Sequence, residues 1–226
     1  MNFKFFSNRK KYGKFSYSQC GEDLIIQYIF NTIGTQKPTY WDLGAFHPYN
    51  ISNTALFYEQ GSRGVNIEPN PYFFNLFKKE RNRDININAG ISFKNGEGTY
   101  YQFDAPTLNS FSEECIKQNI ENGHRLVGTL KIPLLTPLKV SEEYFNGLWP
   151  DFLTIDVEGL DAEILNTLEY DKAGLVVICV EIISYSTLGR GVKNTELIKF
   201  LESKGYLLYA DTYLNGIFVK KNYWYR

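Results

Sequence analysis

The stretch DFLTIDVEGLDAEIL, Asp151–Leu165, joins the end of one expected element to the start of the next. Its first half is a short apolar run that is typical of a strand buried on both faces of a sheet. Its last five residues begin a pattern with helical spacing. Asp156 and Glu158 interrupt the apolar run where the strand should end, and burying an unpaired carboxylate is costly. The acids therefore indicate a functional site at the end of a buried strand.

The same alternation of strand and helix continues through most of the chain. Expected strands occupy 39–45, 64–70, 84–92, 151–157 and 175–182, and expected helices occupy 18–33, 53–61, 71–80, 161–169 and 194–205. Apolar strands that alternate with helices favour an α/β fold, in which a parallel sheet is covered on both faces. The pattern of 206–221 predicts a hairpin that turns at Asn215-Gly216 and adds an antiparallel edge.

We expect a single domain over 1–226. Residues 1–38 would form its helical lead, and 97–150 an insertion, because their pattern is less regular. Within the insertion we interpret 98–104 as an added strand, 111–120 as a helix or loop, and 131–137 as extended chain. Gln19 and Asp23 lie near the start of the first helix, where they would either cap it or belong to a lid over the site.

The composition argues against several classes of protein. There are 24 Lys and Arg against 25 Asp and Glu, whereas proteins that grip nucleic acid over a wide surface usually carry a basic excess. No apolar run approaches the ~20 residues that a membrane-spanning helix needs, and no signal peptide is predicted. The three cysteines are far apart and form no CxxC, so we expect reduced thiols and a cytoplasmic location.

Basic and aromatic residues are mixed at both ends of the chain. MNFKFFSNRKKYGKF opens the sequence and KKNYWYR closes it. Such segments can make a peripheral contact with an anionic membrane, at about 1 kcal/mol per cation. Solvated tails are the commoner case, and we favour them here.

Four expected strands end in an acid: Asp42, Glu68, Asp156 and Glu181. Ligands of open parallel sheets bind outside the carboxyl ends of the strands, so these side chains should line one edge together. For a single strand-end acid, capping of the next helix or acceptance of loop N–H groups is the better explanation, but four together favour a binding edge. Asp161 and Glu163 fall in the first turn of a helix, where acids complement the helix dipole, and we expect both to be solvated.

The turn DLGAFHP, 42–48, indicates which ligand suits this edge. It contains one glycine, Gly44, rather than the GxGxxG of dinucleotide folds, and several acids would repel phosphate. A positively charged nucleoside such as S-adenosylmethionine fits better. Glu68 follows 24 residues after Gly44, where doubly wound folds place an acid on the ribose hydroxyls. Asp42 and Gly44 would then flank the methionyl part.

Three quoted segments carry a family resemblance. SQCGEDLII (18–26), WDLGAFHPYNISNTALFYEQGSRGVNIEPNP (41–71) and FLTIDVEGLDAEIL (152–165) resemble, in order and spacing, the FkbM family of S-adenosylmethionine-dependent methyltransferases. The resemblance implies a class I (Rossmann-like) methyltransferase fold, with a seven-stranded, mostly parallel sheet and an antiparallel strand in the C-terminal hairpin. Family members commonly O-methylate sugars or natural-product hydroxyls.

The resemblance also implies which residues contact the cofactor: Asp42, Gly44, Asn53, Thr54 and Glu68. The expected cofactor site further includes Gln19, Ala45, Pro69, Ser92 and Asp156. One position departs from the family pattern, because Phe46 stands where the family turn usually has Asn. The section after Glu181 resembles the family little, so it identifies no acceptor-binding residues.

Methyl transfer to a hydroxyl needs a group that takes its proton. Asp156, Glu158 and Glu181 are the candidate bases on the strand ends, and His124 is an outside candidate from the insertion. Alternatively, Asp156 and Glu181 would hold Mg²⁺, which lowers the pKa of the hydroxyl. Glu158 has a third interpretation, as a simple cap of the following helix.

The expected function is O-methylation of a sugar hydroxyl, on a nucleotide-sugar or a surface glycan. N-methylation or O-methylation of a natural product is the alternative enzymatic interpretation, and a non-catalytic cofactor-binding module is the alternative outside catalysis. Methylation of nucleic acid is disfavoured, because the motif that NPY (70–72) resembles should end the fourth strand, where the sequence is IDVEG.

Overall fold

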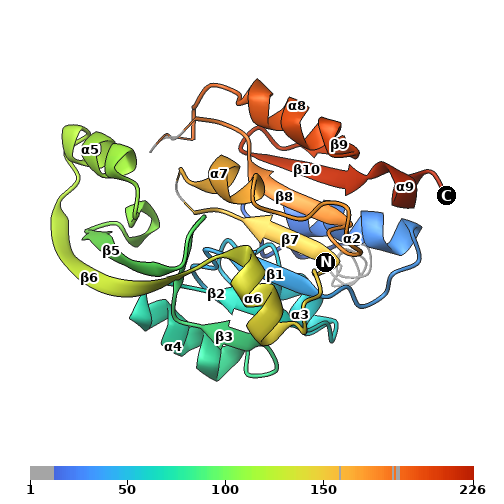
Figure 1. The fold of residues 1–226 in the computed structure, drawn as a ribbon, viewed down its shortest axis with the longest axis horizontal. Helices are drawn as coiled ribbons and strands as arrows, with labels where there is room; N and C mark the ends of the chain where they lie inside the picture. Colours follow the sequence, from blue (N-terminus) through green and yellow to red (C-terminus); the bar gives the residue numbers. More distant parts are fainter. Residues whose placement is uncertain (1–12, 158, 185, 187–188) are drawn as a thin grey trace, which may run out of the picture.

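Seven strands form the central sheet of the protein (Figure 1). The computed structural model describes residues 13–157, 159–184, 186 and 189–226. The strands follow the order β3-β2-β1-β7-β8-β10-β9, with bounds β1 (Tyr40–Leu43), β2 (Gly64–Ile67), β3 (Ile85–Ile87), β7 (Phe152–Ile155), β8 (Val177–Glu181), β9 (Tyr206–Asp211) and β10 (Asn215–Lys220). Neighbours pair in parallel except at β10, which is antiparallel to β8 and β9. The predicted seven-stranded, mostly parallel sheet is confirmed.

Helices cover both faces of this sheet. The helices of the described chain are α2 (Glu22–Thr32), α3 (Ala55–Glu59), α4 (Pro71–Glu80), α5 (Glu113–Glu121), α6 (Pro137–Tyr144), α7 (Asp161–Leu165), α8 (Thr195–Ser203) and α9 (Lys221–Trp224), of which α5 lies away from the central sheet. Side chains of α2 and α3 pack on one face, in a cluster with Tyr40 and Phe152. Side chains of α6, α7 and α8 pack on the other face, in a cluster with Trp41 and Leu153. Two buried faces explain why the inner strands are apolar runs.

Side chains alternate between these two clusters along each inner strand. In β1, Tyr40 packs toward α2 and α3, whereas Trp41 packs on the other face, against Phe145 and Trp149 after α6. By the same period of two, Asp42 belongs to the α2–α3 face. Its register partners there are Asn66 on β2 and Thr154 on β7, and all three are buried. The sheet therefore carries a row of polar side chains beneath α3, just before the strands end.

A second, three-stranded sheet stands beside the first, with the order β4-β6-β5. Its strands are β4 (Gly90–Ile91), β5 (Gly96–Phe103) and β6 (Leu126–Leu135). The chain between β5 and β6 contains the short helix η1 (Pro106–Leu108) and α5. The long curved β6 arches away from the central sheet in Figure 1. The region predicted as less regular thus contains an antiparallel pair of strands, β5 and β6, and the segment predicted as a helix or loop is α5.

Three local predictions differ from the structure. The strand predicted over 84–92 is divided between the two sheets, because the Asn88 side chain donates to the carbonyls of Glu68 (2.8 Å) and Pro69 (3.0 Å) at the break. Helix α6 was not predicted, although Thr136 caps it and a proline follows. The hairpin turns before Asn215-Gly216, at 212–214, where the Tyr213 N–H donates to the Asp211 carboxylate (2.7 Å).

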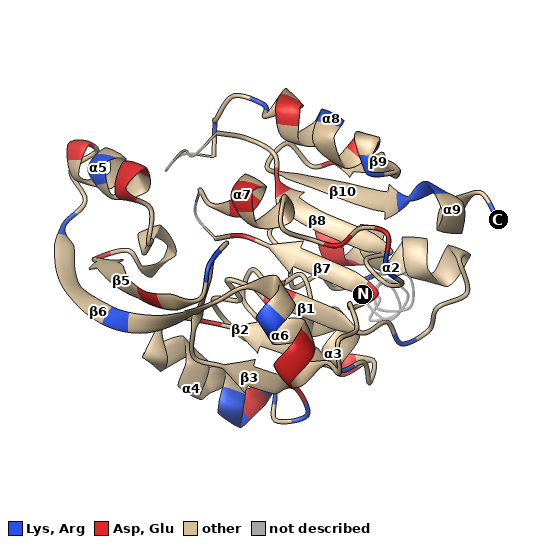
Figure 2. Cartoon of the chain, viewed as in Figure 1, with Lys and Arg blue, Asp and Glu red and all other residues tan. Residues whose placement is uncertain are grey.

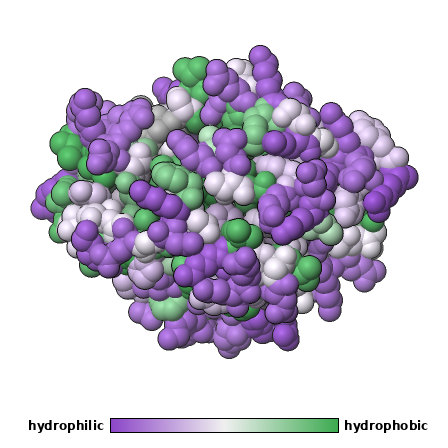
Figure 3. Space-filling model, viewed as in Figure 1, coloured by the Kyte–Doolittle hydropathy of each residue, from purple (hydrophilic) through white to green (hydrophobic). Residues whose placement is uncertain are grey.

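The surface mixes charges of both signs. Acidic and basic residues are interspersed along α4, α5, α6 and α8 (Figure 2). On the face drawn in Figure 3, hydrophobic residues lie in small groups among hydrophilic ones. Among the described residues, no helix has the length and apolar character to cross a membrane. The N-terminal basic residues Lys4, Arg9, Lys10 and Lys11 lie outside the described part of the chain.

Candidate functional site

A cavity of about 280 Å³ opens at the carboxyl ends of β1, β2, β7 and β8. One side is formed by these strand ends, and the other by the end of the second sheet with 106–111. The described lining contains Asp42, Glu68, Asp156 and Glu181 but no Lys, Arg or His. The structure thus brings the four strand-end carboxylates to one cavity. Its charge suits a cationic ligand better than a phosphate-bearing one.

The register of the strands explains why these acids meet. Leu43 pairs with Ile67 and with Ile155, so the residues that follow all three lie at one level, just beyond the sheet. Glu68 and Asp156 occupy that level, and Glu181 ends β8 on the far side of β7. Asp42 lies deeper, within β1. Three of the carboxylates therefore form a rim at the strand ends, and the fourth, Asp42, lies below this rim.

Gly44 occupies the centre of this rim. It has a φ of +80°, which favours glycine, and a Cβ built there would lie 1.9 Å from the Asp156 carbonyl oxygen. The N–H groups of Gly44 and Ala45 both donate to the Ile67 carbonyl at 3.1 Å. The absence of a side chain at Gly44 lets the ends of β1 and β7 approach each other. Any side chain here would push the two strand ends apart.

Glu68 is held by the backbone of two loops. Its carboxylate accepts from the N–H groups of Phe46 and Asn70, each at 2.7 Å. Phe46 reaches this position with a φ of +53°, and its ring packs on Phe73 at 4.6 Å between centroids. Burial raises the pKa of Glu68 to about 8, against the lowering effect of these hydrogen bonds. Each carboxylate oxygen has two lone pairs, so Glu68 retains capacity for ligand hydroxyls.

Thr54 lies behind Asp42 rather than on the cavity wall. Its hydroxyl donates to Asp42 Oδ2 at 2.6 Å, and both side chains are buried. Burial raises the pKa of Asp42 to about 6, while the Thr54 hydrogen bond and the charge of Arg81 lower it. Asn53, the preceding residue, does line the cavity, and its amide donates to Thr154 Oγ1 at 3.0 Å.

Three acids gather at the ends of β7 and β8. Burial, together with the charges of Asp156 and Asp161, raises the pKa of Glu181 to about 8. Asp161 was predicted to be solvated, and that was wrong: it is 7% exposed, and its carboxylate accepts from the N–H groups of Val157 (3.2 Å) and Gly159 (3.4 Å). It folds the loop after β7 back onto α7. Glu163 is exposed, as predicted.

The start of α2 supplies one wall residue and two anchors. Gln19 lines the cavity. The Asp23 carboxylate accepts from Ser16 Oγ (2.6 Å) and the Tyr17 N–H (2.7 Å), which fixes the approach to the helix. The Glu22 carboxylate accepts from Thr212 Oγ1 (2.8 Å) and from the Asn215 amide (3.1 Å). The acids of SQCGED thus hold the segment that carries Gln19 against the start of β10.

The remaining expected residues are divided by the structure. Ala45 and Pro69 line the cavity; Ser92 does not, and the adjacent Ala89–Ile91 do. His124 lies in the loop after α5, 3.9 Å from Asp104, and is not part of the described lining. His47 Nδ1 accepts from two backbone N–H groups of its own turn. Glu158 lies outside the described residues.

Sequence reasoning missed most of the wall opposite the strand ends. This wall contains Tyr100, Pro106, Thr107, Leu108, Asn109, Ser110 and Phe111. It also missed Asn215, which pairs with Glu181 across the β8–β10 ladder and lines the cavity beside it. The segment 106–111 has no periodicity that would assign it to a site. Asn215 was visible only as a turn residue.

The described residues contain no group of three or more His, Cys, Asp or Glu side chains arranged to hold a metal ion. The pair expected to bind Mg²⁺, Asp156 and Glu181, lines the cavity. No disulfide forms among the described residues: Cys20 is exposed, and Cys115 and Cys179 are buried.

Comparison with known families places the chain. Residues 42–208, most of the chain, match the family model described as the methyltransferase FkbM domain. The chain belongs to the FkbM methyltransferase family. It is an S-adenosylmethionine-dependent methyltransferase with the class I fold that its sequence predicted. Among proteins of curated function, none matches this methyltransferase significantly.

Solved methyltransferase structures are similar to this FkbM protein at low identity. A TehB-like SAM-dependent methyltransferase from Corynebacterium glutamicum is 11% identical, with 96% of this chain and 95% of the other covered and a TM-score of 0.41. The 1,6-didemethyltoxoflavin-N1-methyltransferase of Burkholderia thailandensis, solved with 1,6-didemethyltoxoflavin and S-adenosylhomocysteine, is 13% identical, with coverage of 96% and 84% and a TM-score of 0.40. The precorrin-6y C5,15-methyltransferase of Geobacter metallireducens is 16% identical, with coverage of 80% and 72% and a TM-score of 0.35.

Proposed function

We propose that this methyltransferase O-methylates a saccharide, as a nucleotide-sugar or as part of a glycan, in the cytoplasm. The observation that carries the proposal is the cavity itself. Carboxylates form its donor side, and hydroxyl, amide and aromatic side chains form the opposite wall. The first set suits a sulfonium cofactor, and the second suits an acceptor that presents hydroxyl groups and a flat carbon face.

The donor side fits S-adenosylmethionine by the chemistry of its residues. Glu68, at the end of β2, accepts from the ribose hydroxyls, as its lone pairs and position allow. Asp42 and Gly44 lie against the methionyl part, with Gln19 and Asn53 as further polar contacts. The bound cofactor supplies an electrophilic methyl group on a sulfonium. The protein contributes orientation and a negative surface that favours this cation.

The acceptor side is formed by the segment that follows β5. Phe111 packs over Gly90 and Gly98, where a Cβ would lie 2.6 and 3.1 Å from its ring. The Asn109 side chain accepts from the Phe103 N–H at 2.7 Å, which fixes the turn that carries 106–111. Thr107 and Ser110 add hydroxyl groups to the same wall. In this proposal 97–150 is the insertion that selects the acceptor, and 1–38 is the lead that closes the donor side.

Glu181 is the proposed base. Its pKa of about 8 lies near neutral pH, which is where a general base works best. As the acceptor oxygen bonds to the methyl carbon, the carbon–sulfur bond breaks and its electrons stay on sulfur. The hydroxyl proton passes to the Glu181 carboxylate. Asp156 is the alternative acceptor of that proton, and Asp161 holds the loop on which Asp156 lies.

The test is incubation with labelled S-adenosylmethionine and a panel of nucleotide-sugars and glycans, read by mass spectrometry. Labelled methyl on a sugar oxygen is the expected result. Label on nitrogen, or on hydroxylated natural products alone, would replace the saccharide proposal with the corresponding alternative. The absence of saturable binding heat with S-adenosylmethionine and S-adenosylhomocysteine would favour a non-catalytic module.

A further inference from the structure

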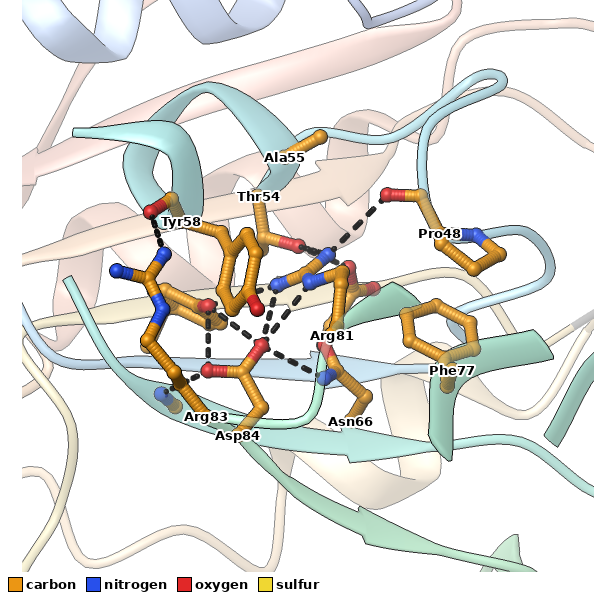
Figure 4. A network of polar contacts seen from close by, with 12 residues as sticks. Pro48, Thr54, Ala55, Tyr58, Asn66, Phe77, Arg81, Arg83 and Asp84 are labelled. Carbon is orange, nitrogen blue, oxygen red and sulfur yellow. Dashed lines mark hydrogen bonds and ion pairs between the residues drawn. The ribbon is translucent and has the colours of Figure 1, made fainter. Parts of the chain in front are cut away.

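Arg81 is a fully buried cation within a network of polar contacts (Figure 4). It follows α4, and its guanidinium lies 5.1 to 5.4 Å from the ring centroids of Tyr40, Tyr58 and Phe77. A buried charge is costly unless it is paired and hydrogen-bonded. Its partners therefore show what the side chain does.

The first set of partners forms a closed unit with Asp84. Arg81 Nη2 lies 2.8 Å from Asp84 Oδ2, and both side chains are 0% exposed. Asp84 also accepts from the Tyr40 hydroxyl (2.7 and 2.8 Å), the Asn66 amide (3.0 Å) and the Gly64 N–H (3.0 Å). This unit joins β1, β2 and the end of α4. It neutralises Arg81 without any contribution from the cavity.

A second branch leads from Arg81 to the cavity. Nη1 donates to Thr54 Oγ1 at 2.9 Å, and the Thr54 hydroxyl reaches Asp42 Oδ2 at 2.6 Å. The direction of these bonds is forced, because a guanidinium only donates and an ionised carboxylate only accepts. The single Thr54 proton must therefore point at Asp42. Asp42 Oδ1 accepts no hydrogen bond from the described part of the chain, and Asp42 lines the cavity.

We propose that Arg81 and Thr54 are positioning residues for the methyl donor: through the Thr54 hydroxyl they hold Asp42 ionised and turn its second oxygen toward the donor's cationic end. This inference rests on the proposed use of Asp42 at the donor side. Asp84 already balances the charge of Arg81, so the Thr54 branch is not needed for neutralisation. Its effect falls on Asp42.

The groups around Asp42 act in opposite directions. Burial and the charge of Asp84 favour its neutral form, while Arg81 and the Thr54 hydroxyl favour the carboxylate. Glu68 at the end of β2 and the buried Cys179 thiol on β8 also feel the charge of Asp42. Removing the Thr54 hydroxyl therefore shifts Asp42 toward the neutral form. A neutral Asp42 binds a cation less well.

Thr54→Val is the variant of choice, because it keeps the shape of the side chain and removes only the hydroxyl. Arg81 itself is unsuitable, since its loss would leave Asp84 buried without a counter-ion. Thr54→Ser restores the hydroxyl. Ser62→Ala is the matched control, because Ser62 is a buried hydroxyl without a hydrogen-bond partner among the described residues.

The primary measurement is the dissociation constant for S-adenosylmethionine by calorimetry. We expect Thr54→Val to weaken binding on the order of tenfold, as for loss of a hydrogen bond to a charged group. Thr54→Ser and Ser62→Ala should bind like the parent. In the Asp42→Asn background, Thr54→Val should have little further effect, because the two residues act as one unit. Full additivity, or equal loss in Thr54→Ser, would overturn the inference.

A second measurement separates this inference from the proposed function. The Asp42 carboxyl carbon, followed by carbon-13 NMR against pH, should titrate near pH 6 in the parent and higher in Thr54→Val. An unchanged titration overturns the relay whether or not the cofactor binds. If the titration shifts as expected but the parent protein shows no affinity for S-adenosylmethionine, the relay stands and the proposed donor site fails.

Discussion

The two halves of the cavity rim differ in what stands behind their carboxylates. Asp42 is joined through Thr54 to the guanidinium of Arg81. Glu181 instead faces two further acids, Asp156 and Asp161, which raise its pKa beyond the effect of burial. A carboxylate backed by a cation keeps its charge and suits binding. A carboxylate backed by other acids takes up a proton near neutral pH and suits proton transfer.

The largest expected effect is that of removing Arg81, the cation behind Asp42. Arg81→Met leaves Asp84 buried without its counter-ion, so we expect a loss of about 3–5 kcal/mol in the free energy of unfolding. Urea denaturation measures it. Arg83→Met is the control, because Arg83 lies two residues away and is exposed, and it should change stability far less. Equal losses in the two variants would show that the buried network contributes no more to the free energy of unfolding than the exposed Arg83 does.

The acid-backed half should respond in turnover rather than in stability. Glu181→Gln removes the proposed base, and we expect kcat to fall about 100-fold or more while the affinity for S-adenosylmethionine is kept. Asp156→Asn should also lower turnover and spare cofactor affinity. Glu163→Gln, an exposed acid on α7, is the control. If both site variants turn over normally, neither residue takes the proton.

A substitution of Glu68 tests the binding half of the rim with a smaller expected effect. Glu68→Gln keeps the size of the side chain but replaces one acceptor oxygen by an amide, so a ribose hydroxyl or a loop N–H loses its partner. We expect roughly tenfold weaker binding of S-adenosylhomocysteine. Calorimetry would show it. A Glu68→Gln variant that binds normally but turns over slowly would place this acid in catalysis instead.

A change of pH should distinguish the two halves of the cavity rim without any substitution. Because the pKa of Glu181 is raised to about 8, turnover should rise with pH up to that value, and Glu181→Gln should lose this dependence. The raised pKa values of Glu68 and Glu181 also mean that the folded protein binds more protons than the unfolded chain. Stability should therefore fall as pH rises from the ordinary carboxyl pKa of about 4.5 toward 8. A flat rate profile over this interval would contradict the assignment of Glu181.

The smallest expected effect is that of metal removal. With Glu181 as base, EDTA should change turnover by less than about twofold, because the proton has an acceptor without a metal. Atomic absorption on the purified protein would accompany the assay. Loss of activity with EDTA and recovery with Mg²⁺ would assign Asp156 and Glu181 as ligands and replace the base mechanism.

The sheet and its acid edge were predictable because both follow from local patterns. Apolar runs predicted the buried strands, and an acid at the end of four of these runs predicted the rim. The partners of those acids were not predictable. Arg81 belongs to the run KKERNR at the end of α4, where nothing in the sequence distinguishes a buried guanidinium from its exposed neighbours. Asp161 seemed a helix-dipole acid, and only the fold of the preceding loop shows that it is buried.

The wall of the cavity formed by 106–111 was missed for a different reason. The segment 106–111 is short, and its residues meet the cavity only because the second sheet carries them there. Pairing of β5 with β6 joins residues up to about 40 positions apart, such as Gly96 and Leu134, and no local pattern specifies that contact. Thr54 was predicted to contact the cofactor, but it lies behind Asp42 and does not line the cavity, because the period of two does not tell which polar residue reaches the cavity wall.

The second sheet leaves and rejoins the rest of the chain at one spot. β4 pairs with the end of β6, Ile91 beside Leu135, and the Ser92 N–H donates to the Leu135 carbonyl at 2.9 Å. A segment whose two ends adjoin can be exchanged as a cassette without moving the remainder. If this segment selects the acceptor, as proposed, transplanting 92–135 between relatives would change the acceptor and leave the methyl donor unchanged. Recombination at these two adjacent chain positions would then give enzymes with new substrates.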